Sequence, residues 1–274
     1  MYKGSGYSLA DTAVFIPVAA LLAMASLTAR RLLGRADPSA EGMFALTMAG
    51  ASLLMRLRWM YVMPLMVVGV AVVGALVVYG VNSLCHMELW LTGALFSVAS
   101  LLVCNGINVG YSSPFGSARG QMLVGFCIII PLCVVWTLFT RTRLALGIRA
   151  AVMDGGEMRY RIVSPGTAVA TSLAIGGIFA GAAGILIAML ATDRASLLPA
   201  GAWIGGMAAA GLGRIVVRKR NRGGAWDCAA ALVGAILWCA LAAAVNSLVN
   251  MTSWLDNRAV IGILAIAFAA LGYR

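Results

Sequence analysis

The stretch Arg141–Ser164, RTRLALGIRAAVMDGGEMRYRIVS, is the longest polar interval in an otherwise apolar sequence and lies near its middle. Apolar runs long enough to cross a bilayer flank it on both sides. Within it, Leu144, Ile148 and Val152 recur at i, i+4 and i+8, which predicts one face of a short helix, and a Gly-Gly pair would end that helix. The interval is either a docking surface for another protein or a solvated basic loop that only fixes topology.

Composition places the whole chain in a membrane. Of its 274 residues, 62% are apolar and 11% are charged, whereas soluble domains contain about 25% charged residues. The net charge of +11 would suggest nucleic acid in a soluble protein, but the arginines cluster between apolar segments, where retention on the cytoplasmic side and attraction to membrane lipid explain them. We therefore expect an all-α, polytopic transmembrane helix bundle forming one domain over residues 1–274, without a nucleic-acid partner.

About eight or nine membrane segments can be traced. The second of them, Met43–Met55, is shorter than the roughly 20 residues of a straight span, so we expect it to be re-entrant or broken. A glycine face in a later segment, formed by Gly177, Gly181 and Gly184, predicts close helix packing. The apolar runs are 12–28, 43–55, 59–81, 87–104, 121–140, 167–191, 197–212, 226–249 and 260–273.

The positive-inside bias sets the expected orientation. With residues 141–164 in the cytoplasm, Arg30–Arg35 and Arg214–Arg222 fall on the same side. Arg56 and Arg58 fall outside, against the rule, and a re-entrant second segment would move the N-terminus to the other side.

Groups for catalysis are scarce. The chain has one histidine and nine acidic residues, and it contains no phosphate-binding loop or zinc-hydrolase motif. Its six cysteines are scattered through apolar runs without a metal-ligand spacing, so we expect neither a metal site nor an enzyme.

Charged and small residues gather where the first helical pattern breaks, at Asp37, Ser39, Glu41 and Gly42. These residues could line a polar translocation path, because ionisable groups at membrane depth are costly and usually functional. The acids could instead cap the second segment, since carboxylates favour a helix N-terminus. Capping is the favoured interpretation.

Several stretches resemble one transporter family. The sequence Asp37–Leu46, DPSAEGMFAL, resembles the D-x-[ST]-x-[DE]-G-x-F-x-L stretch of bacterial ABC-importer permeases for tryptophan, tyrosine or other small solutes, which are related to branched-chain amino-acid and ribose permeases. Thr142–Ala150, TRLALGIRA, is similar to that family's approach to the loop that contacts the ATPase, and Ala174–Leu186 is similar to the next helix. The segments Ala230–Val249 and Asp256–Leu271 match the last two helices in character. After Arg149 the sequence departs from the family's R-A-x-G-[DE]-N-P pattern.

The resemblance implies a permease subunit of an importer in the bacterial cytoplasmic (inner) membrane. Its partners would be a cytoplasmic ATP-binding subunit, an extracytoplasmic solute-binding protein and a second permease copy, identical or paralogous. ATP would be bound by the partner, so the chain itself would need no cofactor. The residues implied in ATPase coupling are Leu144, Gly147, Ile148, Arg149, Ala150, Asp154 and Gly155. The alternative is an ion-coupled secondary transporter that acts without an ATPase.

Overall fold

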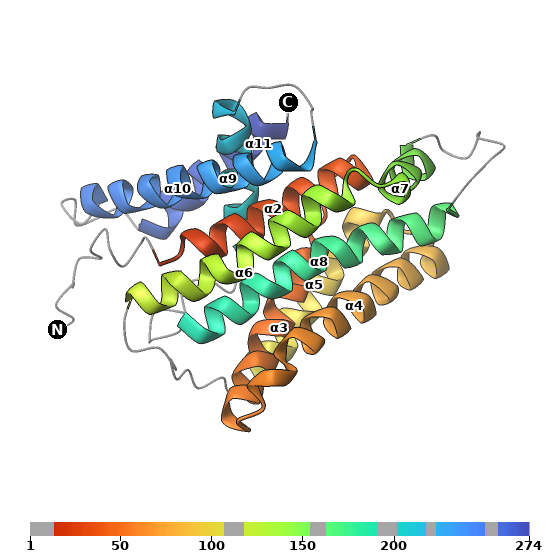
Figure 1. The fold of residues 1–274 in the computed structure, drawn as a ribbon, viewed down its shortest axis with the longest axis horizontal. Helices are drawn as coiled ribbons and strands as arrows, with labels where there is room; N and C mark the ends of the chain where they lie inside the picture. The colour runs from red at the N-terminus through yellow and green to blue at the C-terminus, as the bar shows by residue number, and fades with distance from the viewer. Residues whose placement is uncertain are drawn as a thin grey trace.

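The computed structural model describes residues 14–106, 118–153, 163–190, 202–217, 223–249 and 257–273, and all regular structure in these ranges is helical (Figure 1). This confirms the all-α fold class. The helices are α2 (Ile16–Leu33), α3 (Ser39–Arg56), the 3-10 turn η1 (Met60–Val62), α4 (Met63–Cys85), α5 (Leu89–Gly106), α6 (Ala118–Phe139), α7 (Arg143–Met153), α8 (Pro165–Leu190), α9 (Ala202–Val216), α10 (Gly224–Val249) and α11 (Asn257–Tyr273).

Within the described ranges, five helices are long and apolar enough to cross a membrane. They lie in α2, α4 with its preceding turn, α6, α8 and α10, and shorter apolar helices are found in α5, α9 and α11. By length and composition, the protein is a multi-pass membrane protein. The segment expected at Met43–Met55 is longer in the structure, because α3 begins at Ser39 and ends at Arg56.

Local signals account for the ends of the first helices. Pro17 stands in the first turn of α2, where a missing N–H costs no hydrogen bond. The helix ends at Gly34, whose φ of 70° is in the left-handed region and whose N–H donates to the carbonyl of Arg30 at 3.1 Å. His86 likewise ends α4 with a left-handed backbone conformation, at φ of 51°.

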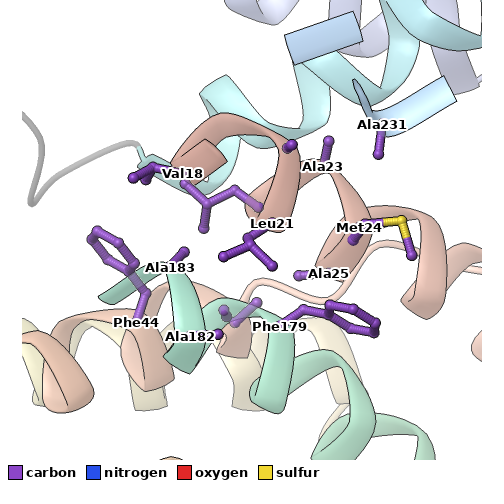
Figure 2. Packing of buried hydrophobic residues seen from close by; sticks show 14 of the residues in the cluster. Val18, Leu21, Ala23, Met24, Ala25, Phe44, Phe179, Ala182, Ala183 and Ala231 are labelled. Atoms are coloured by element: carbon purple, nitrogen blue, oxygen red, sulfur yellow. The ribbon is translucent and has the colours of Figure 1, made fainter. Parts of the chain in front are cut away.

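Helices α2 and α8 form the centre of the bundle. One side of α8 packs against α3 and α4, and α2 lies between α8 and the layer of α9 and α10. Figure 2 shows Leu21 of α2 directed toward Ala182 and Ala183 of α8, with Ala231 of α10 on the other side of α2. Small side chains at these crossings let the backbones approach closely.

The glycine face of α8 lies against α3 and α4. A Cβ atom added to Gly184 would lie 2.5 Å from the carbonyl oxygen of Phe44, and one added to Gly181 would lie 3.0 Å from Cγ1 of Val67. The small residues are therefore required by close helix contact, as the sequence predicts.

The short helix α7 follows α6 after a turn. The hydroxyl of Thr142 accepts a hydrogen bond from the N–H of Ala145 at 3.3 Å, which caps the first turn. The body of α7 packs on α2 and α8 at one end of the bundle.

Candidate functional site

The α2–α3 connection carries a buried acid into the middle of the bundle. Residues 34–38 separate the two helices, and the Asp37 side chain is 4% exposed. A Cβ atom added to Gly176 of α8 would lie 3.9 Å from Oδ2 of Asp37 and 3.8 Å from the carbonyl oxygen of Ala25 in α2. The carboxyl group is thus enclosed between α2 and α8.

The position of Asp37 along the bundle is near half-height. Gly176 is close to the centre of the 26-residue α8, about 17 Å from its first residue at 1.5 Å per residue. Met43, in the second turn of α3, lies against Gly74 near the centre of α4 and Gly177 of α8. Helix α3 therefore starts near the middle of the bundle rather than at its end, with non-helical backbone leading to it. Such backbone is tolerated at membrane depth where protein surrounds it.

One oxygen of Asp37 caps α3. Its Oδ1 accepts hydrogen bonds from the Ser39 backbone N–H at 2.9 Å and from the Ser39 hydroxyl at 2.6 Å. Pro38, directly before the first helical residue, already has helical backbone angles, with φ of −71° and ψ of −15°. The capping interpretation of Asp37 agrees with this geometry.

The other oxygen is not used for capping. Asp37 Oδ2 is buried without a hydrogen-bond partner among the described residues, and the same is true of the Thr28 hydroxyl in α2. Thr28 lies one turn beyond Ala25, on the side of α2 that approaches Gly176. A buried polar atom without a partner costs free energy unless a ligand or a water satisfies it. Each of these two atoms can accept a hydrogen bond from a cationic or hydroxyl-bearing group.

The remaining residues of the break attach it to α5. The Ser97 hydroxyl donates to the Pro38 carbonyl at 2.6 Å and accepts from the Gly42 N–H at 3.0 Å. Glu41 is half-buried and its N–H donates to Pro38 at 3.1 Å. The structure thus brings Asp37, Ser39 and Gly42 together, while Ser97 and Thr28 were missed, because a single hydroxyl in an apolar run carries no sequence signal.

The predicted coupling residues of α7 divide into exposed and buried positions. Leu144 is exposed, at 49%, but Ile148 is 1% exposed and belongs to the core cluster, with Val152 packed beside it. The expectation that Ile148 faces a partner is wrong, because this side of α7 is covered by α2 and α8. Leu146, at 62%, is exposed instead.

The other predicted coupling residues are either partly buried in α7 or outside the described residues. Gly147, Arg149 and Ala150 are half-buried, and Arg149 lines a cavity described below. Asp154 and Gly155 lie outside the described residues. In the part of the chain with described side chains, no three His, Cys, Asp or Glu side chains come together as a metal site would require.

Comparisons with family models, with curated proteins and with solved structures found no match. Function must therefore be argued from the geometry.

Proposed function

We propose that this chain is the permease subunit of an ATP-driven importer for a small solute, such as an amino acid, in a bacterial cytoplasmic membrane. In this proposal α2–α6 and α8–α11 are the membrane segments, and the non-helical residues 34–38 separate the first of them from the second. The other components are a cytoplasmic ATP-binding subunit, an extracytoplasmic solute-binding protein and a second permease copy.

The observation that carries the proposal is the position of α7. It packs on α2 and α8, and these are the two helices that enclose Asp37. A displacement of α7 would therefore reach both walls of the buried polar site. This arrangement suits a subunit whose interior is opened by a partner at one end of the bundle.

The exposed side of α7 offers a docking surface. Leu144 and Leu146 are exposed in the first turn of α7, beside Arg143, while Ala145 and Ile148 face the bundle. Exposed leucines on a short helix whose other side is packed can fill an apolar groove of a partner. The ATP-binding subunit would take this role.

Asp37 would act in the translocation path. Its Oδ2, together with the Thr28 hydroxyl, could hold the ammonium group of an amino acid for a short time. Since Asp37 is 4% exposed, solute reaches it only when α2 and α8 separate. The solute-binding protein would supply high affinity, so few polar groups are needed in the permease.

The test is a double substitution on the exposed side of α7, Leu144→Glu with Leu146→Glu. The tagged chain in mild detergent should lose a co-purifying ATP-binding subunit and solute uptake, while its melting temperature stays unchanged. The matched control is Leu57→Glu, because Leu57 is also exposed, at 54%, but lies directly after the C-terminal end of α3, outside α7. Retention of the subunit by a folded double variant would refute the docking role.

A second candidate is an ion-coupled carrier, favoured by the unpartnered Oδ2 of Asp37, because such carriers bind a coupling ion at buried acids near mid-membrane. Purified chain alone, reconstituted in liposomes, would then move solute along an ion gradient, and Asp37→Asn would stop it. Under the first proposal the chain alone moves nothing.

A further inference from the structure

Four arginines from three helices meet at a cavity at one end of the bundle. The cavity has a volume of about 140 Å³ and is lined by Leu27, Arg30, Arg31, Arg149, Arg214 and Asp227. One buried water needs roughly 10–15 Å³, so there is room for a group of several heavy atoms. Arg214 is exposed, which leaves the cavity accessible from the surface.

The one acid of this lining is already occupied. Asp227 Oδ2 accepts from Nη1 of Arg31 in a salt bridge, and the indole N–H of Trp136 approaches the same oxygen at 3.4 Å. Asp227 therefore pairs directly with Arg31 and attracts Arg214 only over a longer range, and among the described residues no salt bridge involves Arg149 or Arg214. The lining as a whole has a formal charge of +3.

Helix ends explain part of this arrangement. Arg30 and Arg31 lie in the last turn of α2 and Arg214 in that of α9, where cations favour the helix dipole. That account does not extend to Arg149, which lies in the middle of α7, nor to the convergence of the four side chains on one cavity. Like charges gathered around a cavity repel one another unless an anion is held between them.

We propose that this cavity binds a phosphate group, with Arg149 and Arg214 as its main ligands. Guanidinium groups bind phosphate oxygens through paired hydrogen bonds. Two sources share this chemistry, the headgroup of an anionic phospholipid and free phosphate, and basic pockets between membrane helices are known to suit the former. The bound phosphate links α7 to α2 and α9 from within the chain, whether or not a partner docks on the exposed side of α7.

The experiment uses the full chain, delipidated in neutral detergent. One arm adds phosphatidylglycerol or, for comparison, phosphatidylcholine, and measures bound lipid by native mass spectrometry and the shift in melting temperature. The other arm adds inorganic phosphate, with chloride at equal ionic strength as the reference, because salt screens exposed charges. Selective binding of phosphatidylglycerol identifies the headgroup as the source, and a shift with inorganic phosphate identifies the free anion.

The variant Arg149→Gln with Arg214→Gln should weaken the binding by about tenfold or more, since each arginine contributes charged hydrogen bonds. Arg149→Lys with Arg214→Lys should keep part of it, and Arg58→Gln, a charge change after the far end of α3, should leave it unchanged. Equal binding by the glutamine variant and the wild type overturns the proposal. So does a wild-type chain that distinguishes neither phosphatidylglycerol from phosphatidylcholine nor phosphate from chloride, and this result needs no variant to fold. Neither outcome depends on an ATP-binding subunit.

Discussion

Helices α2 and α6 both contain an 18-residue candidate membrane span, yet they occupy opposite environments. The span in α2 is 83% buried inside the protein and that in α6 is 17% buried, although α6 is the more apolar of the two. When the five candidate spans are ranked by rising hydropathy, their buried share falls at every step. In water the hydrophobic effect would favour the opposite order. This order is the one expected when lipid, and not water, is the solvent of the outer surface.

The two helices also differ in what holds them. Helix α6 exposes large apolar side chains such as Ile130, Val135 and Leu138, which lipid can solvate. The interior crossings are made by glycine and alanine, because close backbone contact replaces the missing hydrophobic drive between helices. Within the candidate spans, the two least apolar helices, α2 and α8, are therefore the two at the centre of the bundle.

The largest effect that would test this comparison is expected at an interior glycine. Gly184→Ala should lower the free energy of unfolding by about 3 kcal/mol, because the new Cβ meets backbone atoms of α3, which cannot rotate away. Gly69→Ala in α4 has open space around it and should change the stability by less than about 1 kcal/mol. Unfolding in mixed micelles measures both. Equal effects would mean that α3 and α8 are not in close contact.

A smaller effect is expected from shortening a leucine. Leu21→Ala should cost about 2 kcal/mol, the low end of the range for core leucines, because lipid removes the water-transfer part and leaves only lost packing. Leu21 is 1% exposed and Leu138 is 60% exposed, so Leu138→Ala should cost less than about 0.5 kcal/mol. The same unfolding assay compares them. A larger loss at Leu138 would place α6 inside an interface.

The smallest effect concerns the polar interior. Asp37→Ala should cost about 1 kcal/mol, since it removes the cap of α3. Asp37→Asn keeps the acceptor oxygen and should cost less than about 0.5 kcal/mol, while transport is lost if Oδ2 binds the solute. Glu88→Ala, at an exposed acid that holds only the Trp90 indole N–H at 2.5 Å, is the control. If Asp37→Asn is as destabilising as Asp37→Ala, the Oδ2 atom of Asp37 must have a partner that stabilises the fold.

Sequence patterns predicted the elements better than their surroundings. The Leu144–Ile148–Val152 spacing predicted a helix, and α7 is found at Arg143–Met153. The same spacing could not say which side of α7 meets the bundle, because periodicity shows only which residues share a face. For this reason Ile148 was predicted to face a partner although it is buried against the bundle, and the exposed Leu146 was overlooked.

The arginine-lined cavity and the depth of Asp37 could not be predicted from the sequence, because both depend on contacts between distant segments. Arg30, Arg149 and Arg214 were expected on the same side of the membrane, and the cavity that they share places them at one end of the bundle. Their convergence has no local signal, since each belongs to a different helix. Asp37 was recognised as a cap, but its depth follows from its contact with Gly176, far away in the sequence.

The late position of α8 in the chain has a consequence for biogenesis. Helix α3 is not among the candidate spans, and its close packing partner α8 begins at Pro165, 109 positions after Arg56. At roughly 5–20 residues per second, a ribosome needs about 5–20 s to synthesise that interval. During this time only helices made before α8, chiefly α4 and α5, can shield the polar start of α3. The membrane-insertion machinery would therefore retain an incomplete bundle until α8 packs against α2, α3 and α4, which are already in place, and α9, α10 and α11 follow.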